Sequence, residues 1–526
     1  MTQVTDQFAT PEPKPFIDGS GPRNVVVILL DSLNRRMLGC YGGTEFETPN
    51  LDRLAARSLR FDRHYSASLP CMPARHDILC GAWDFLWRPW GSIEIWESNI
   101  AREMRMHGVA TGIITDHPHL FETGGENYHT DFGMWDYVRG HEGDPWRLRE
   151  DPSWVGTPAL PATEGWVHRG YDTSRTWFRD EADFPGPRTM QATADWLDRN
   201  AGHHDRFFLF VDEFDPHEPF DTPERWAYRY HDQRDEPLQI WPPYGRHVIE
   251  KGFITEHQAE QLRANYGAKL SMIDHWLGKV LDSMDNNGLW DDTALFLVTD
   301  HGHYLGERDE MFGKPLSPIY NLLGAIPMLV AWPGVEPGSR DALTTSVDVH
   351  ATLTDLFNLE IEHRTHGVSL RGVIEGTRPT AHEYLLQGYF GREVNVIDRE
   401  GKYIRGVEGE RTDVSVWSNR WSTMPVHAFP RLSLARPDDR ATLDRMPGSD
   451  IPVIRQPFTA DDLNSGAVYL AGQTAGAESE LYDTSDSEES EDLADSARSN
   501  HYVALLRHAL IEVEAPSEQF VRLGLD

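Results

Sequence analysis

Short apolar runs that each end in polar, ligand-type residues are the feature that most limits how this chain can fold. Asn24–Leu30 is a continuous aliphatic run followed directly by Asp31, and runs at 110–114, 206–211 and 294–298 precede other polar turns. A run that is apolar at every position is typical of a strand covered on both faces, as in parallel sheets. Because ligands bind at the carboxyl ends of such strands, the polar turns are candidate site residues.

Helices are predicted between these strands. Thr48 and Pro49 fit the N-cap and the first position of one helix, and apolar spacing predicts a long helix from Glu256 to about Met284. A fifth strand is predicted at 327–331. Strands that alternate with helices predict an α/β fold, with a parallel or mixed sheet flanked by helices on both faces.

Three parts are predicted along the 526 residues of the chain. Residues 1–22 are polar and Pro-rich and are expected to form an N-terminal arm, and residues 23–390 are expected to form the catalytic α/β domain. After about residue 390, short strand candidates such as 402–406 and a helix near 498–513 predict a smaller α+β C-terminal subdomain, 391–526.

Charge and cysteine content narrow the class of protein. The net charge is −35, from 49 basic and 84 acidic residues. Nucleic acids and anionic membrane surfaces attract basic proteins, so neither is expected as a partner. Three cysteines, Cys40, Cys71 and Cys80, are too few and odd in number for a disulfide framework. The N-terminal segment lacks the residue order of a secretion signal, so a cytoplasmic location is expected.

Two polar turns carry metal-ligand side chains. Asp31 and the Asp300-His301 pair together supply two carboxylates and an imidazole. A lone Asp after a strand is more often a helix cap, but an Asp-His pair followed by Gly302 is rarer and offers two ligand types at one tight turn. Oxygen-rich sites suit Ca²⁺, Mg²⁺ or Mn²⁺, and the imidazole favours Mn²⁺.

Cys71 differs from the other two cysteines in its neighbours. A cytosolic cysteine is usually a small buried hydrophobe, and Cys40 and Cys80 fit that interpretation. Arg75 follows Cys71 by four residues, which is one helical turn, so both side chains are expected on the same face. An arginine in that position can hold a thiolate or a bound anion.

Lys314 and His217 are further candidates. A lysine is usually a solvated surface charge, but Lys314 lies between Gly313 and Pro315 soon after the metal-type turn, which favours an anion ligand. His217 follows the run at 206–211 and is a candidate general acid, with an ordinary surface histidine as the equal alternative.

Several blocks of this sequence resemble the sulfatase family. The Cys-x-Pro-x-Arg motif at 71–75 is similar to the sulfatase signature, although Cys80 stands where the family has Thr in the Leu-Thr-Gly element that follows. The Asp-His-Gly block and the Gly-Lys pair further along also match. The matching blocks are Thr48–Ala55, Cys71–Gly81, Trp290–Gly302, Gly313–Lys314, Ser346–Leu356 and Leu481–Ala494.

The resemblance implies an alkaline-phosphatase-like α/β fold and a formylglycine made from Cys71. It also implies that Asp31, Asp300, His301 and the modified residue 71 bind one divalent metal, Ca²⁺ or Mn²⁺. A hydroxyl of the hydrated aldehyde would attack the sulfur of a sulfate ester. The products would be an alcohol and inorganic sulfate, so the implied activity is that of a sulfuric ester hydrolase.

The same resemblance implies roles for four side chains that would contact the substrate. Arg75 and Lys314 would hold the sulfate oxygens. His217 would protonate the leaving alcohol and would also bind the substrate. His119 would act as the base that releases sulfate from the covalent intermediate.

Two departures from the family pattern bear on these roles. Many sulfatases have a second acidic residue directly after the first metal Asp, where this chain has Ser32. The lysine usual before His119 is absent, so a positive charge must come from elsewhere, with Arg88 as a candidate. The roles of Asp116 and His117 stay open.

Three functions therefore remain in view. A sulfatase is the first, a phosphonate monoester or phosphodiester hydrolase on the same machinery is the second, and a non-catalytic anion- or metal-binding relative is the third. Ser32 and His301 favour the second slightly, and rates on aryl sulfates and aryl phosphonates would separate the first two. Metal-dependent folding without turnover would indicate the third.

The sequence leaves the alcohol half of the substrate open. Four tryptophans soon after the nucleophile could be aromatic walls for a sugar or aryl group, or core residues. The expected partners are a small-molecule or carbohydrate sulfate ester and a formylglycine-generating enzyme for maturation. The oligomeric state, monomer or homo-oligomer, is open. The four tryptophans are Trp83, Trp87, Trp90 and Trp96.

Overall fold

The computed structural model describes most of the chain. The predicted arm at 1–22 lies, apart from its last two residues, outside the described residues. Among the described helices, none is long and apolar enough to cross a membrane. The described ranges are 21–161, 169–232, 234–315, 318–408, 414–421, 441–458, 478–494 and 496–526.

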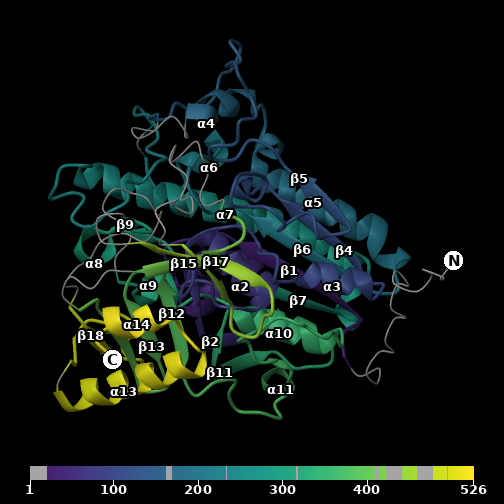
Figure 1. Ribbon diagram of the computed structural model, residues 1–526. Coiled ribbons are helices and arrows are strands. Elements are labelled where there is room, and N and C mark those ends of the chain that lie inside the picture. Colours follow the sequence, from purple (N-terminus) through teal and green to yellow (C-terminus); the bar gives the residue numbers. More distant parts are fainter. Residues whose placement is uncertain are drawn as a thin grey trace.

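A mixed sheet of eight strands forms the centre of the molecule (Figure 1). Its order is β11-β2-β10-β7-β1-β6-β4-β5, and β10 is the strand that runs antiparallel to its neighbours. The strands are β1 (Asn24–Leu30), β2 (Leu59–Tyr65), β4 (Ala110–Thr115), β5 (Met134–Tyr137), β6 (Phe207–Glu213), β7 (Thr293–Val298), β10 (Leu329–Ala331) and β11 (Gly338–Thr345).

The central strands are buried on both faces, as their continuous apolar runs predict. In β1, Val25 and Val27 belong to the core on one face, whereas Val26 and Ile28 belong to the core on the other. All four side chains are fully buried. Alternate side chains of a strand point to opposite faces, so a strand with two covered faces must be apolar throughout.

Helices cover both faces of this sheet (Figure 1). Those packed in the first core are α2 (Cys71–Cys80), α3 (Ile100–Met106), α10 (Val347–Leu356) and α11 (Arg371–Ile374). Those packed in the second core are α1 (Pro49–Ala55), α5 (Pro185–Asn200) and α7 (Glu256–Asn286). Short helices lie at α4 (Arg169–Ser174), α6 (Glu224–Ala227), α8 (Glu307–Glu310) and α9 (Asn321–Gly324).

A second sheet joins the C-terminal part to the segment that precedes Cys71. Its order is β18-β14-β13-β12-β3, and β3 (Ser68–Leu69) pairs in parallel with β12. Two helices, α13 (Ser496–Glu512) and α14 (Ser517–Arg522), lie with this part (Figure 1). The remaining strands are β12 (Leu385–Tyr389), β13 (Val394–Ile397), β14 (Gly401–Arg405), β18 (Glu480–Asp483), the set β15 (Val414–Ser418), β16 (Thr442–Arg445) and β17 (Pro452–Phe458), and the pair β8 (Tyr304–Leu305) and β9 (Phe312–Gly313).

The predicted α/β class, strands and long helix are confirmed, and so are the positions of Thr48 and Pro49 at the start of a helix. Helix α1 begins at Pro49 as predicted, but the side chain of Thr48 makes no capping bond. Its hydroxyl instead accepts from the backbone N–H of Gly39. Asp274 of α7 caps α1, because its carboxylate accepts from the N–H groups of Asn50 and Leu51 at 3.0 and 2.7 Å. Three strands of the sheet, β2, β5 and β11, were not predicted.

Candidate active site

The carboxyl ends of adjacent central strands bring the predicted polar turns together. Asp31 follows β1, and Asp300 with His301 follows β7, its neighbour in the sheet. Asp212 is the next-to-last residue of β6, which pairs with the other side of β1. All four side chains are buried, so this edge of the sheet holds a dense group of polar residues beneath the surface.

Cys71 reaches this edge from β2 by way of β3. It is the first residue of helix α2, and all ten residues of that helix are buried. The sulfur lies 3.3 Å from Nε2 of His301. Burial, followed by the nearby Asp31 carboxylate, raises the pKa of the Cys71 thiol. An unmodified Cys71 without a metal is therefore a neutral thiol, which is a poor nucleophile.

Asp31, Cys71, Asp300 and His301 form a compact candidate metal group, in which one ligand atom from each residue lies within 4.8 Å of the others. Nδ1 of His301 lies 2.8 Å from the backbone oxygen of Gly302, which can only accept, so Nδ1 carries the proton. Nε2 thus presents its lone pair on the side of Cys71. Burial lowers the pKa of His301 to about 4, which keeps this ligand nitrogen unprotonated at neutral pH.

The backbone around the metal group is shaped to hold the two aspartates. Ser32 has a positive φ of 59°. Its hydroxyl donates to Asp31 and its N–H donates to Asp300, at 2.8 and 3.0 Å. A Cβ at Gly302 would lie 2.0 Å from the backbone oxygen of Leu322, so the close chain approach at this turn requires glycine. Two oriented carboxylates and an imidazole are a donor set that fits Ca²⁺ or Mn²⁺.

Arg75 contacts mainly the residues of and around the metal group. Its Nε and Nη2 donate to Asp212, Nη2 also contacts Asp31, and Nη1 donates to Asp300 and to the backbone oxygen of Cys71. Hydrogen bonds use four of the five N–H donors of the guanidinium, because the contact between Nη2 and Asp31 is an ion pair in which Oδ2 of Asp31 accepts no hydrogen bond. These contacts fit an arginine that orients the candidate metal ligands, and the contact of Arg75 with sulfate oxygens stays a prediction.

Lys314 and His217 form a close pair beside this group. Nδ1 of His217 lies 2.7 Å from the backbone oxygen of Glu218, so Nδ1 carries the proton, and Nε2 accepts from Lys314 Nζ at 2.5 Å. Burial lowers the pKa of His217. Burial also favours the neutral amine of Lys314, yet Cys71, Tyr244 and Glu218 raise its pKa well above the ordinary value. Lys314 is therefore the proton-carrying member of the pair.

His119 lies between two carboxylates. Its Nδ1 is 2.9 Å from Glu122 and its Nε2 is 3.1 Å from Glu142, and the edge of its ring meets Trp90 with centroids 5.1 Å apart. Burial alone would lower the pKa of His119, but Glu142 and Glu122 raise it to about 10. A histidine that already holds both protons at neutral pH cannot accept another, which argues against the predicted role as a base.

His117 has the opposite environment. It is fully buried, and neither ring nitrogen has a hydrogen-bond partner among the described residues. Its Nδ1 lies 3.8 Å from Asp212, which is beyond hydrogen-bonding distance. Burial lowers the pKa of His117, followed by the charge of Arg75, so the imidazole is neutral.

A second group of ligand-type residues lies at the other end of helix α2. His76, Cys80 and Glu97 also have ligand atoms within 4.8 Å of one another. Nine residue steps separate Cys80 from Cys71, about 13 Å along the helix axis. Arg88 donates to Glu97 and to two further acids, so ion pairs explain why the residues of this second group lie together. Because its guanidinium is bound to these acids, Arg88 does not offer a free donor for the positive charge that the candidate active site lacks. The two further acids are Asp84 and Glu94.

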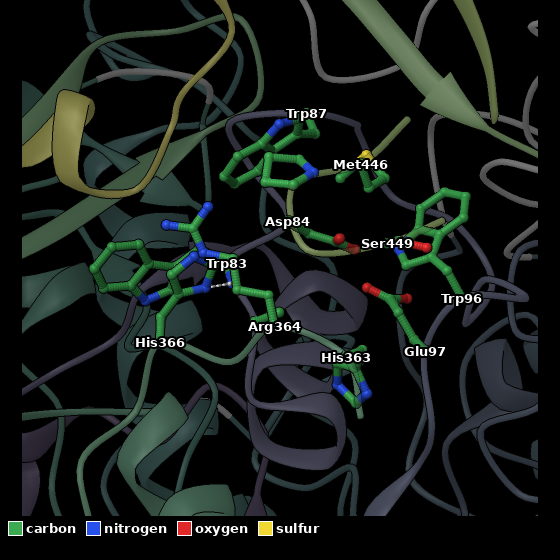
Figure 2. Close-up of a pocket in the computed structure, with 12 residues that line it drawn as sticks. Trp83, Asp84, Trp87, Trp96, Glu97, His363, Arg364, His366, Met446 and Ser449 are labelled. Carbon is green, nitrogen blue, oxygen red and sulfur yellow. Dashed lines mark hydrogen bonds between the residues drawn. The ribbon is translucent and has the colours of Figure 1, made fainter. Parts of the chain in front are cut away.

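The predicted tryptophan walls divide between the two ends of α2. Trp90 lies against His119 in the candidate active site. Trp83 stacks on His366 with ring centroids 4.8 Å apart, and Trp87 and Trp96 line the same separate pocket (Figure 2). All four tryptophans are less than one tenth exposed.

Two site residues were missed by the sequence analysis. Asp212 follows an apolar run at a strand end, which is the same sequence signal that marks Asp31. Glu142 lies in an irregular segment with a positive φ of 41°, where no periodic pattern marks it. The sequence therefore carries a signal for Asp212 but none for Glu142.

Comparisons with known proteins show which family this sequence matches. The sequence model of the Sulfatase family matches residues 23–359. The choline-sulfatase of Rhizobium meliloti is 26% identical over 73% of this chain and 78% of its own length. The arylsulfatase of Clostridium perfringens is 25% identical over 72% of this chain and 85% of its own length.

Solved structures share the fold across nearly the whole chain. The phosphonate monoester hydrolase of Agrobacterium radiobacter has a TM-score of 0.61 and 17% identity, with 94% of this chain and 95% of that chain covered. A structure in complex with its substrate D-glucosamine-2-N,6-O-disulfate also has a TM-score of 0.61, with 14% identity and 94% and 99% coverage. At these identities the likeness concerns the fold alone, and it confirms the predicted alkaline-phosphatase-like architecture.

Proposed function

Because the chain belongs to the sulfatase family, we propose that it hydrolyses a sulfate ester to an alcohol and inorganic sulfate, with residue 71 in its formylglycine form as the nucleophile. The observation that carries this proposal is the metal group itself. The sulfur of Cys71 and one ligand atom each of Asp31, Asp300 and His301 all lie within 4.8 Å of one another at the carboxyl edge of the sheet. A nucleophile in that position would be held directly beside a divalent cation.

Asp31, Asp300, His301 and residue 71 would hold the cation, Ca²⁺ or Mn²⁺. When bound, a divalent cation neutralises charge on the sulfuryl oxygens and lowers the pKa of the nucleophilic hydroxyl. Arg75 keeps the two aspartates in place through its contacts to both and to the backbone oxygen of residue 71. We therefore assign Arg75 a positioning role.

Lys314 and His217 would handle the leaving oxygen. Lys314 carries a proton, donates it toward Nε2 of His217 at 2.5 Å, and is 8% exposed. The pair can deliver that proton to the departing alkoxide, which general acid catalysis requires when the alcohol is a poor leaving group. The ammonium of Lys314 also offers further N–H donors for a sulfuryl oxygen.

The substrate is proposed to be a small-molecule or carbohydrate sulfate ester. The relatives carry the names choline-sulfatase and arylsulfatase, and one structural neighbour was solved with a sulfated glucosamine. Trp90, at the edge of the site, can contact an alkyl, aryl or sugar group. A formylglycine-generating enzyme would be needed for maturation. The free cysteines are compatible with the predicted cytoplasmic location.

Two variants of helix α2 test the nucleophile. The full chain is produced together with a formylglycine-generating enzyme, and mass spectrometry of the peptide that contains residue 71 records whether the thiol has become an aldehyde. Cys71→Ala is expected to abolish turnover of 4-nitrophenyl sulfate while the fold is retained. Cys80→Ala, a buried cysteine at the other end of the same helix, is the matched control and is expected to keep activity. Activity like that of the unaltered chain in Cys71→Ala would refute the mechanism.

A phosphonate monoester hydrolase is the second candidate, because the site carries Ser32 in place of a further acid and His301 in the metal group. Its test is the ratio of kcat/KM for an aryl sulfate and for the matching aryl phosphonate monoester on the same preparation. A ratio above one supports the sulfatase, and a ratio well below one supports the phosphonate hydrolase.

A further inference from the structure

Four histidines surround the ring of Phe214, and they differ in how their nitrogens are used. The ring centroids of His117, His217, His141 and His119 lie 4.3, 4.1, 4.8 and 6.1 Å from that of Phe214. Phe214 follows β6 and lies two residues after Asp212. One aromatic ring therefore fixes the positions of four imidazoles next to the candidate active site.

Three of these histidines have partners for their Nε2 atoms. Nε2 of His217 accepts from Lys314, and Nε2 of His141 lies 2.7 Å from Asp215. Both nitrogens of His119 face carboxylates. These three imidazoles are already engaged within the protein.

His117 is the exception. It is 0% exposed, and within the described part of the chain neither of its nitrogens reaches a hydrogen-bond partner. Buried polar groups are almost always hydrogen-bonded, so a buried imidazole without a partner calls for a ligand that supplies one. The neighbours of this ring are the Asp212 carboxylate, which binds Arg75, and Phe214, which stacks on His217. Because Asp212 and His217 belong to the candidate active site, the substrate of that site is the ligand that we expect at this ring.

We propose that His117, and not His119, is the histidine of this loop that contacts the substrate, donating a hydrogen bond to a non-bridging oxygen of the sulfuryl group. This inference rests on the proposed function. A neutral imidazole has one N–H donor, and a sulfuryl oxygen can only accept, so the pairing is chemically complete without any proton transfer. His119, held between Glu122 and Glu142, supports the wall of the site through its contact with Trp90.

Three variants test the assignment in the full chain loaded with formylglycine and metal. His117→Ala is expected to lower kcat/KM for 4-nitrophenyl sulfate about 10- to 100-fold, which is the value of one hydrogen bond to a charged group. The inhibition constant of inorganic sulfate should rise by a similar factor. His117→Gln, whose amide can still donate, should recover part of both losses. His141→Gln is the matched control, because His141 packs on the same ring but is bonded to Asp215, and it should change sulfate inhibition less than threefold.

The outcomes separate this inference from the proposed function. If the unaltered chain hydrolyses sulfate esters but His117→Ala keeps both kinetic values within twofold, the inference is wrong and the proposed function stands. A larger loss of sulfate inhibition in His119→Gln than in His117→Ala would also overturn it. If the unaltered chain hydrolyses no sulfate ester, the proposed function fails, and calorimetric titration with inorganic sulfate still decides whether His117 contacts the anion.

Discussion

Replacing Arg75 with alanine would leave three buried carboxylates without their shared cation. Asp31, Asp212 and Asp300 each have an oxygen within 2.9 Å of the guanidinium, and none of the four side chains is more than 1% exposed. Water cannot compensate for the lost charge at this depth. Removing one partner of a buried ion pair typically costs about 3–5 kcal/mol, because the remaining charge is neither paired nor solvated.

Arg53 supplies a matched control on the surface. It also pairs with two aspartates, Asp282 at 2.8 Å and Asp285 at 2.5 Å, but its side chain is 36% exposed and theirs are 62% and 38% exposed. Exposed ion pairs contribute about 0–1 kcal/mol, because water screens the charges and the side chains lose entropy on pairing. Arg53→Ala should therefore lower the free energy of unfolding by no more than about 1 kcal/mol.

Equilibrium unfolding in urea, followed by tryptophan fluorescence, measures both variants in a chelator and again with excess Mn²⁺. Arg75→Ala should lose at least about 2 kcal/mol more than Arg53→Ala in the chelator. Excess Mn²⁺ should narrow the difference, because a bound cation offsets part of the unpaired negative charge. Equal losses in the two variants, or a difference that Mn²⁺ leaves unaltered, would refute the interpretation of Arg75 as the counter-ion of the metal ligands.

Three further predictions follow from the same structure. Asp300→Asn should weaken Mn²⁺ binding at least about tenfold by calorimetry, whereas Asp341→Asn, an exposed carboxylate on β11, should leave it unaltered. Lys314→Ala should lower kcat/KM for an alkyl sulfate by about 10²- to 10⁴-fold. The loss for 4-nitrophenyl sulfate should be clearly smaller, because nitrophenolate departs without a proton. Lys251→Ala, which changes an exposed lysine, should show no such dependence on the leaving group. Burial lowers the pKa of His64 to about 4, below the value near 6.5 in the unfolded chain, so the folded state excludes a proton that the unfolded state binds. Stability should thus fall as pH drops from about 6.5 to 4, by up to about 1.4 kcal/mol per pH unit for this group, and His64→Gln should show a shallower slope in urea unfolding at pH 7 and 5.

The main strands were predictable because burial on both faces leaves a strong signal in the sequence. β1 is apolar at almost every position, and its end at Asp31 was predicted to the residue. β2 (Leu59–Tyr65) was missed because its sequence carries Arg60, Asp62 and Arg63, whose charged ends reach the surface near the edge of the sheet. A strand near the edge need not be apolar, and its polar positions then look like a loop.

The cluster of metal-ligand residues was also predictable, because the carboxyl ends of parallel strands meet at one edge. The states of the histidines were not predictable in this way. His117 and His119 are two residues apart in one short turn, yet His119 faces Glu122 and Glu142 whereas His117 has neither. Glu142 comes from an irregular segment 23 positions further along the chain. Only the three-dimensional packing decides which imidazole is protonated.

The charges in the candidate active site link metal binding to sulfate binding. When ionised, Asp31, Asp212 and Asp300 carry three negative charges, and Arg75 and Lys314 carry two positive ones, which leaves −1. Burial, followed by the charge of Asp300, raises the pKa of Asp31, so without a cation this group can reduce the excess by holding a proton. A divalent cation would displace that proton, and the sum of these charges would change from 0, with Asp31 protonated, to +1. In a protein with a net charge of −35, we infer that this gain of positive charge favours the entry of an anionic ester into a site built largely of carboxylates.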